Sequence, residues 1–428
     1  MGNNKKSRIR FGVIILLTLV ISFTGGFFTH YLLQSKTIRK INDVLTIIEK
    51  NSKSPYGEDL DFDSDEITKQ FVEAILSNDN YAKYFTHSEY EKEENEGKGN
   101  YIGIGVSLYS DQPIIYKVIG NSPAESAGLK PNDEILKAKK SGGEYREFES
   151  TSSLTEYLKG LKEGDVVDFL VKREGEENKE YSIRISEYIA SYVKYYDNQC
   201  SIRFVSELGQ TPKLTKFSEE KLSILDDKTA FIQFESFEGS ASTQLDEVLK
   251  YFYESGKSKL IFDLRDNGGG YMSTLLDVAP NFIYNNGSKK SLITRVEGRD
   301  YYADYSTKTR KFNTQLKDVV VLANSNTASA SECLIGAMLC YGDANFSMDK
   351  LLISYNSARQ DFSTFGKGIM QTTYTLPSGG ALKLTTAKLF QPDLTTCIHG
   401  VGIRQTNELN QVTDSTALLR AVEILSAS

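Results

Sequence analysis

The chain has 428 residues, of which 39% are hydrophobic and 25% charged, and its formal net charge is −7. This length predicts two or three domains, and this composition is typical of a folded rather than a disordered chain. The negative charge argues against a nucleic-acid binder, because that role needs a basic surface that displaces counterions from phosphates. Four cysteines without a C-x-x-C pair argue against a zinc or redox site and favour free thiols.

The first 34 residues combine a basic segment with a long apolar run. Residues 1–10 contain several lysines and arginines, and residues 11–33 are apolar and long enough to span a bilayer as a helix. A cleaved signal peptide has a shorter apolar region and a small-residue cleavage site, which this segment lacks. The basic flank predicts that residues 1–10 are cytoplasmic and that the chain after Gln34 is outside. We therefore expect a single-pass protein of the cell membrane with an extracytoplasmic body.

Residues 34–96 are expected to form a helical stalk, a linker and the N-terminal helices of the core. Apolar residues recur at helical spacing over 37–50, which predicts an amphipathic helix that serves as a stalk or as a homodimer contact. Residues 51–64 are polar and acidic and contain a proline and a glycine, as in a linker. Ser64 is then expected to cap a further helix.

The pattern changes over residues 97–188, which are expected to form one compact α+β module. Ser122 and Pro123 suit the start of a short helix, and Gly128 suits its end. Strands are predicted at 101–109, 114–119, 134–139, 166–172 and 181–185, and helices at 122–128 and 152–161.

Two segments of this module, Tyr101–Val106 (YIGIGV) and Ser122–Leu136 (SPAESAGLKPNDEIL), resemble a PDZ domain. A PDZ domain adds a peptide as a strand and holds its terminal carboxylate with the backbone N–H groups of one loop. The resemblance implies that the partners are peptides with free C-termini. A PDZ fold that acts as a scaffold without a peptide ligand stays open. The loop implied by the resemblance consists of Ile102, Gly103, Ile104 and Gly105.

Strands and helices alternate over residues 189–428, which is the pattern of α/β layering. The fold class expected for the whole chain is a multidomain α/β (α+β) protein, with an N-terminal transmembrane helix, a PDZ domain and a mixed α/β core. In the core, strands are predicted at 230–234, 260–264, 318–323, 372–376 and 381–389, and helices at 243–253, 273–283, 330–341 and 416–425.

Few routes to hydrolysis are open to a chain with three histidines and no H-x-x-x-H pair. A Ser-His-Asp triad would have to use His87 or His399, and neither lies in a recognisable catalytic turn. No metal site and no cofactor are predicted. A serine with a lysine base remains, an arrangement that recurs on unrelated folds.

Lys367 has the surroundings that a lysine base needs. A base must be neutral at working pH, which requires burial, and the neighbours of Lys367 in Thr364–Gln371 (TFGKGIMQ) are uncharged and partly apolar. An ordinary loop lysine is the alternative interpretation. Ser347 and Lys350 fit the S-x-x-K spacing of penicillin-binding enzymes, but the K-T-G partner of those enzymes is missing.

Ser329 is the favoured nucleophile, because an apolar strand, a turn of small residues and a helix follow one another around it. At a helix N-terminus, free N–H groups and the helix dipole stabilise a developing oxyanion. Plain N-capping by Ser329, with Glu332 completing a capping box, explains the same pattern. Taken alone, these residues favour plain N-capping.

Four segments decide in favour of catalysis. They are Asp263–Gly270 (DLRDNGGG), Thr327–Glu332 (TASASE), Thr364–Gln371 (TFGKGIMQ) and Gly380–Ala387 (GALKLTTA). Residues 225–405 thereby resemble the carboxyl-terminal processing, or tail-specific, peptidases, which also place a PDZ domain before the core. The resemblance implies that Ser329 is the nucleophile, Lys367 its general base and Gln371 the residue that orients the base.

The same resemblance implies an oxyanion hole made by the Ala330 N–H and one N–H from Gly269 or Gly270. Four residues of extended strand span about 13 Å, so a glycine or a bulge must bring Gln371 to Lys367. The chain departs from the family pattern at four places: Thr327, Gly268, the long connection 341–361, which predicts an extra surface loop, and residues 402–407.

The expected function is that of a membrane-anchored serine endopeptidase that cuts exported proteins or peptides near their C-termini. Its PDZ domain is expected to recognise the substrate tail or to gate the active site. One alternative is a PDZ scaffold on a degenerate peptidase core, which the retention of Ser329, Lys367 and Gln371 argues against. Another is a penicillin-interacting enzyme, which a β-lactam would acylate.

Overall fold

The predicted membrane anchor at 11–33 and most of the predicted helix at 37–50 lie outside the residues that the structure describes. The chain divides into two units, Met1–Asn78 and Asp79–Ser428. Helix α3 (Asp65–Ile75) belongs to the first unit, and no helix in the described part of the chain is both long and apolar enough to cross a membrane. The computed structural model describes residues 65–206, 210–284, 290–307, 310–357, 359–377 and 379–427, together with Ile38, Lys40, Ile41 and Val44.

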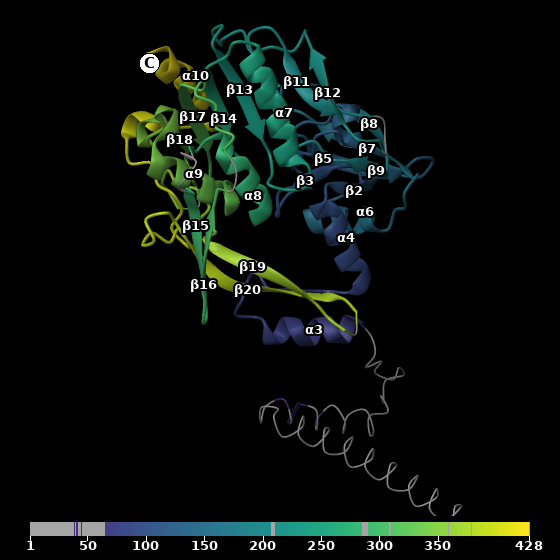
Figure 1. The fold of residues 1–428 in the computed structure, drawn as a ribbon. Helices are drawn as coiled ribbons and strands as arrows, with labels where there is room; N and C mark the ends of the chain where they lie inside the picture. The colour runs from purple at the N-terminus through teal and green to yellow at the C-terminus, as the bar shows by residue number, and fades with distance from the viewer. Residues whose placement is uncertain are drawn as a thin grey trace, which may run out of the picture. The chain divides into compact units, whose positions relative to one another are not determined.

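The module predicted at 97–188 has a small core of its own within the second unit (Figure 1). Ile135, Leu154 and Phe169 are fully buried at its centre. Strands β6, β5, β7 and β8 form one sheet in that order, while β2 pairs with β9 and β3 with β4. The elements are β2 (Asn100–Gly103), β3 (Val106–Leu108), β4 (Ile115–Val118), α5 (Pro123–Ala127), β5 (Glu134–Lys140), β6 (Arg146–Glu147), α6 (Thr151–Lys159), β7 (Val166–Lys172), β8 (Lys179–Arg184) and β9 (Ser186–Ile189).

The single strand predicted over 101–109 is wrong, because the chain leaves the extended conformation between β2 and β3. Ile104 turns into the core of the module, and its carbonyl accepts a 2.8 Å hydrogen bond from Ala124 N–H at the start of α5. Gly105 has a φ of +85°, and a Cβ there would lie 2.2 Å from the Cβ of Ser122. This close approach restricts the position to glycine.

An eight-stranded sheet forms the centre of the second unit. Its pairs from β13 onward are parallel, and the three pairs before them are antiparallel. In spatial order the strands are β12 (Lys213–Phe217), β11 (Ser201–Val205), β10 (Val193–Tyr196), β13 (Thr229–Phe234), β14 (Lys259–Asp263), β17 (Asp318–Ala323), β18 (Leu351–Ser354) and β21 (Gln411–Val412).

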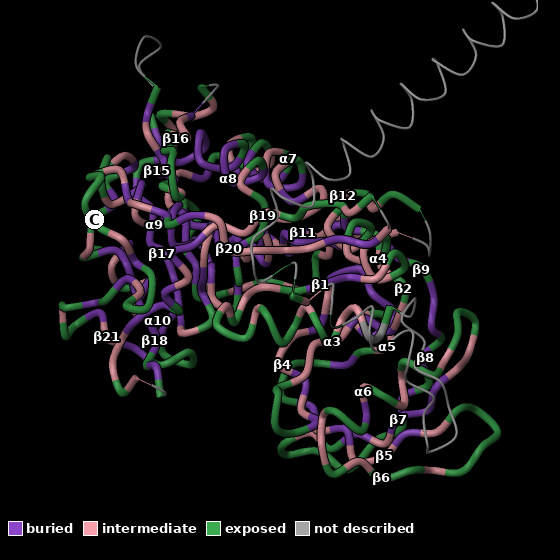
Figure 2. Tube along the Cα trace, turned by 90° about the horizontal axis from the view of Figure 1, so that it is seen from below, coloured by how far each residue is buried: buried purple, intermediate pink, exposed green. Residues whose placement is uncertain are grey.

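Both faces of this sheet are covered by helices, as the apolar runs of its parallel strands require. Successive side chains of a strand point to opposite faces. Phe262 therefore packs towards α7 (Ala241–Glu254), α8 (Met272–Val278) and α9 (Ala330–Tyr341), whereas the next residue back, Ile261, packs towards α10 (Asp414–Ser426) (Figure 1). Figure 2 shows the resulting line of buried residues along β17.

A second sheet contains the predicted hairpin. Its strands are β1 (Lys83–Phe85), β15 (Leu292–Gly298), β16 (Tyr302–Ser306), β19 (Ile369–Thr375) and β20 (Ala381–Phe390). Strand β1 was not predicted, because residues 34–96 were expected to be helical outside the linker, yet Tyr84 pairs with Leu382 of β20. Helix α4 (His87–Gly97) follows β1, and the Thr86 hydroxyl caps it by accepting from the Glu89 N–H at 3.3 Å.

The long connection 341–361 is only partly the surface loop that its length predicts. Residues 351–354 form β18, which is buried in the main sheet. Just before it, the 3₁₀ turn Met348–Lys350 places the Lys350 ammonium in an ion pair with Asp318. Lys350 and Asp318 are both buried, so the lysine of the S-x-x-K spacing forms a buried ion pair that stabilises the fold.

Replacing Lys350 by Met should lower the free energy of unfolding by about 3 kcal/mol, because it leaves the Asp318 carboxylate buried without its cation. Urea denaturation followed by circular dichroism measures this difference. The exposed neighbour Lys317 provides the matched control, since Lys317→Met should change stability by less than about 0.5 kcal/mol. Equal stability of Lys350→Met and the parent protein would contradict the structural role of the pair.

Candidate active site

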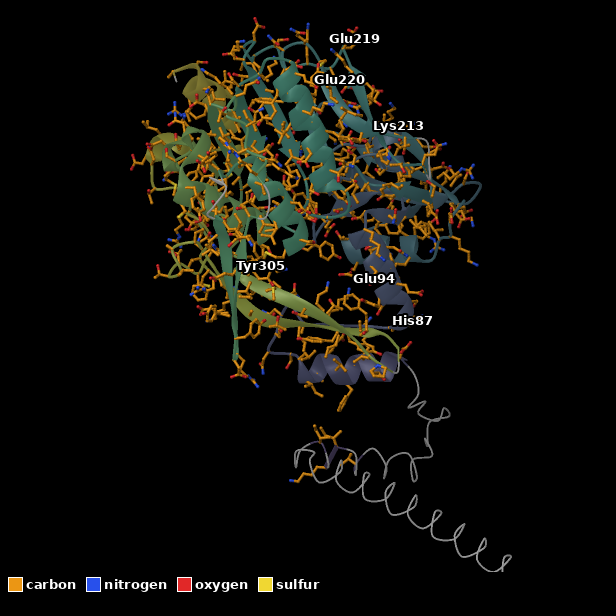
Figure 3. All side chains as sticks on the ribbon, viewed as in Figure 1. His87, Glu94, Lys213, Glu219, Glu220 and Tyr305 are labelled. Carbon is orange, nitrogen blue, oxygen red and sulfur yellow. The ribbon has the colours of Figure 1, made fainter. Side chains whose placement is uncertain are left out.

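The predicted catalytic and oxyanion residues line one cleft of about 820 Å³ in the second unit. Its walls come from the PDZ module, from α4, from β19 and β20 of the second sheet, and from α8, α9 and loops that adjoin strands of the main sheet. Glu94, labelled on α4 in Figure 3, belongs to this lining. The lining includes Ser329, Lys367, Gln371, Ala330, Gly269 and Gly270.

Ser329 has an unusual backbone conformation, with φ of 57° and ψ of −115°. The capping box with Glu332 is present, but an ordinary N-cap residue lies in the β region, so plain capping alone does not account for this turn. A non-glycine residue in such a region costs about 1–3 kcal/mol and persists only where its surroundings hold it. Part of that support is a 2.9 Å hydrogen bond from the Ser329 N–H to Glu332 Oε2.

The turn before Ser329 is fixed by backbone carbonyls of the segment that follows β14. Asn267 O accepts a 3.0 Å hydrogen bond from the Ala328 N–H and a 3.1 Å bond from the Ser331 hydroxyl. The Thr327 hydroxyl donates to Leu264 O at 2.8 Å. Thr327 therefore keeps the hydroxyl of the serine that it replaces in the family pattern, and its fully buried position suits the extra methyl group.

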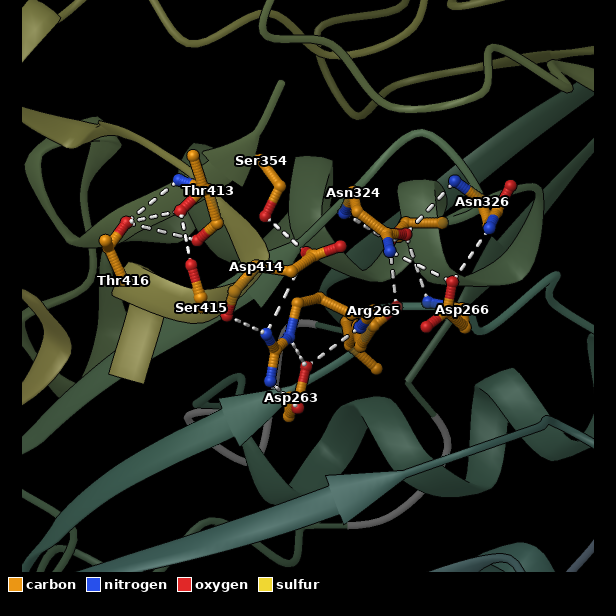
Figure 4. A network of polar contacts seen from close by, with 12 residues as sticks. Asp263, Arg265, Asp266, Asn324, Asn326, Ser354, Thr413, Asp414, Ser415 and Thr416 are labelled. Carbon is orange, nitrogen blue, oxygen red and sulfur yellow. Dashed lines mark hydrogen bonds and ion pairs between the residues drawn. The ribbon is translucent and has the colours of Figure 1, made fainter. Parts of the chain in front are cut away.

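A polar network joins the same edge of the sheet to α10 (Figure 4). Arg265 makes a two-pronged contact with Asp263, at 2.9 and 2.8 Å, and also donates to Asp414 O at 2.8 Å. Asp266 Oδ1 accepts from the side-chain amides of Asn324 and Asn326 at 3.0 and 2.8 Å. The Asp263–Gly270 segment thus positions the glycine loop against the nucleophile turn.

The two glycines proposed for the oxyanion hole differ in whether their N–H groups already have a hydrogen-bond acceptor. Gly269 has a φ of +98°, and a Cβ there would lie 2.8 Å from the Cβ of Ser329, so the glycine loop touches the nucleophile. The Gly269 N–H already donates to Asn267 Oδ1 at 2.9 Å. Among the described residues, neither the Ala330 N–H nor the Gly270 N–H has a protein acceptor. This pair is free to bind an oxyanion.

Lys367 and Gln371 meet as the resemblance implies. The lysine Nζ donates to Gln371 Oε1 at 3.0 Å, and the Gln371 amide donates in turn to Tyr81 O. The pairing register shifts between Met370 and Gln371, so the predicted bulge is present. Burial lowers the pKa of Lys367, and the charge of Lys383 lowers it further.

Glu332 was expected only to complete a capping box, and its contacts with the loop of Lys367 were not predicted. Its fully buried carboxylate accepts four hydrogen bonds: from the Ser329 and Lys367 N–H groups at 2.9 Å each, from the Gly366 N–H at 2.8 Å and from the Thr364 hydroxyl at 2.6 Å. Burial raises the pKa of Glu332, and the four donors oppose that shift. The capping-box spacing S-x-x-E was the available signal, but it indicates only the contact with Ser329.

The predicted carboxylate loop lines a second hollow, of about 1090 Å³. Ile102–Gly105 lie on one side of it, α6 on another and α4 on a third. Helix α4 separates the two hollows, because Glu93 and Glu94 line the catalytic cleft whereas Glu91 and Asn95 line the PDZ groove.

The two histidines considered as alternative bases do not reach the cleft. His87, the first residue of α4 (Figure 3), is exposed and lies 3.4 Å from Glu91. His399 is also exposed, and neither lines the catalytic cleft. The described residues contain no group of three or more His, Cys, Asp or Glu side chains that could hold a metal ion.

Comparison with known proteins agrees with this geometry. Residues 228–345 and 362–409 match Peptidase family S41, and residues 100–185 match the PDZ domain. The "Probable CtpA-like serine protease" of Staphylococcus aureus (strain COL) is 27% identical over 401 residues, which cover 91% of this chain and 69% of that protein. The solved structure of the photosystem II D1 C-terminal processing protease shares the fold, with a TM-score of 0.50 and 18% identity over 91% of this chain and 90% of that one.

The segments that match Peptidase family S41 contain both Ser329 and Lys367, and the PDZ match contains the loop 102–105. The predicted kinship with carboxyl-terminal processing peptidases is thereby confirmed. Residues 228–345 and 362–409 therefore form an S41 peptidase domain that follows a PDZ domain, and the chain is a serine peptidase.

Proposed function

We propose that the protein is an endopeptidase that cuts exported proteins near their C-termini, with a Ser329–Lys367 dyad as its catalytic machinery. The observation that carries the proposal is the convergence, in one cleft, of a strained serine, a lysine with a lowered pKa and two N–H groups without protein acceptors. Strained residues and perturbed pKa values cluster at functional sites. A degenerate scaffold would have no need of this arrangement.

The reaction follows from the positions of these groups. Neutral Lys367 takes the hydroxyl proton of Ser329 as Ser329 Oγ attacks the scissile carbonyl, and the Ala330 and Gly270 N–H groups bind the oxyanion. Protonated Lys367 then gives the proton to the leaving amine, which leaves an acyl-enzyme. Water hydrolyses that ester with Lys367 again as base. Lys367 Nζ donates to Gln371 Oε1 and has no hydrogen bond with Ser329 Oγ among the described contacts, so the two side chains must approach each other for the first step.

Hydrolysis of a denatured protein substrate by the region after residue 64 tests this proposal. Ser329→Ala and Lys367→Arg should both be inactive, since the first lacks the nucleophile and the second carries a base that stays protonated. Normal cleavage by Lys367→Arg would overturn the dyad. Ser329→Gly should also be inactive but should unfold with a free energy about 1 kcal/mol higher than Ser329→Ala, because glycine accepts the backbone of this turn without strain.

The pH dependence of turnover reports the base. Activity should rise with pH along one limb, because only neutral Lys367 accepts a proton and its pKa lies below that of free lysine. Lys383→Met removes a positive charge that lowers this pKa, so the limb should move to higher pH with the plateau unchanged. Lys388→Met, an exposed position on the same strand β20, should leave the limb in place. Identical limbs for Lys383→Met and the parent would rule out Lys367 as the titrating group.

We further propose that the PDZ groove binds the free C-terminus of the substrate. The support is that the loop Ile102–Gly105 lines the groove and that Ile102 in this loop is exposed. Fluorescence anisotropy with inactive Ser329→Ala protein should show binding of peptides that end in an apolar residue with a free carboxylate. Amidation of the terminus should weaken binding at least about tenfold, since it removes the charge that the loop N–H groups recognise. Equal binding of both peptides would exclude carboxylate capture.

A membrane anchor at residues 11–33 completes the proposal. It rests on the basic residues before this apolar run and on its length. Protease added to intact cells whose outer surface is permeable should digest the region after Gln34. A cytoplasmic marker protein should survive the same treatment. Digestion of the region only after lysis would place the catalytic part in the cytoplasm instead.

A further inference from the structure

Residues 346–361 lie between the two segments that match the peptidase family, and they connect the helix of the nucleophile to the loop of the base. After β18 this connection makes a tight turn. Asn356 and Asp361 pair with each other through backbone hydrogen bonds of 2.6 and 3.3 Å, and Asn356 Oδ1 accepts from the Arg359 N–H at 3.2 Å. The turn therefore holds Arg359 at a defined place between its two ends.

The guanidinium of Arg359 reaches the loop that carries Lys367. Its Nη1 donates to Thr364 O at 3.2 Å and to Val401 O at 2.9 Å, and its Nη2 donates to Phe365 O. All three acceptors are backbone carbonyls. Gly366 fits directly against this group, because a Cβ there would lie 3.1 Å from Arg359 Nη2, and its φ of +87° suits glycine.

The opposite side of the same loop is held by Glu332, which accepts from the Gly366 and Lys367 N–H groups. The carboxylate thus binds the N–H groups of the loop and the guanidinium binds its C=O groups. Residues 364–367 form neither helix nor strand, so these two charged groups supply hydrogen bonds that regular structure would otherwise provide. The guanidinium suits this task, since it presents several donors in one rigid plane.

We propose that Arg359 is a positioning residue for the general base, supplied by a segment that lies outside the family match. By fixing the carbonyls of Thr364 and Phe365, Arg359 holds the backbone of Lys367 at the place from which its side chain reaches Ser329 Oγ. The inference rests on the proposed role of Lys367. It assigns a catalytic consequence to the long connection, because displacement of the turn would release the base from the nucleophile.

Steady-state kinetics of Arg359→Ala, normalised to the folded fraction, test the inference. Turnover (kcat) should fall about 10- to 100-fold, because small misplacements of a catalytic group have costs of this size, while KM changes by less than about twofold. Guanidinium chloride, added well below the unfolding transition, should restore part of the lost turnover. The turnover of Arg359→Lys should lie between that of the parent protein and that of Arg359→Ala, since an ammonium donates hydrogen bonds but cannot span three carbonyls.

Arg404 offers a matched control next to the same turn. Its guanidinium lies 3.3 Å from Asp361 and is more than half exposed, so Arg404→Ala should keep parental turnover. Hydrogen exchange gives a readout that does not depend on activity. Arg359→Ala should speed exchange at residues 364–367 and leave the N–H groups of α9 unchanged.

Parental turnover per folded molecule in Arg359→Ala would overturn the inference, and so would unchanged exchange at 364–367. If Arg359→Ala does not fold, turnover and hydrogen exchange at residues 364–367 are measured on Arg359→Lys instead. The proposed function fails separately, through an active Lys367→Arg protein. An inactive Lys367→Arg together with a fully active Arg359→Ala would therefore reject the positioning role while leaving the dyad intact.

Discussion

The arrangement of the active site depends on one buried carboxylate. Glu332 lies in the first turn of α9, three residues after Ser329, and is fully buried. A buried charge is costly unless its hydrogen bonds are satisfied, and this carboxylate has a donor for each of its four lone-pair directions. One donor belongs to the nucleophile turn, at Ser329, and the other three belong to the base loop 364–367. This side chain, together with the 3.0 Å hydrogen bond from the Phe365 N–H to Thr327 O, thereby sets the spacing of the two backbones.

The strained turn at Ser329 is explained by the same support. A strained backbone persists where its surroundings determine it, and the surroundings here are the Glu332 carboxylate, the Asn267 carbonyl and the close approach of Gly269. The strain directs Ser329 into the cleft while the following N–H of Ala330 stays without a protein partner. An N-cap serine in the relaxed β conformation would direct its hydroxyl only towards the N–H groups of its own helix.

Helix α4 connects the peptidase chemistry to the PDZ groove. It has no fully buried residue, and its polar side chains line both hollows. It is held at its ends, by Thr86 at the start and by the hydrogen bond from Gly239 N–H to Gly97 O, at 3.0 Å, near its C-terminal end. A ligand in the groove and a substrate in the cleft therefore contact opposite sides of the same short helix.

The sequence by itself determined the kinds of element and the chemical groups. The predicted bounds of β7, β17 and α9 match the structure, because each is an apolar run with polar or turn-forming residues next to it. The motifs predicted Ser329, Lys367 and Gln371 as the reacting groups, and the three residues line one cleft. Short strands such as β1, which has only three residues, escaped prediction, because their stability comes from a partner strand distant in the sequence.

Only the tertiary structure decided how the groups are used. That the Gly269 N–H is occupied, that Glu332 reaches the base loop and that Arg359 returns to it are contacts between residues that lie between 2 and 35 positions apart. Hydrogen bonds of this kind leave no periodic signal, since they depend on where loops meet in space. The sequence therefore determines which residues can react, and the fold determines which groups hold them in place.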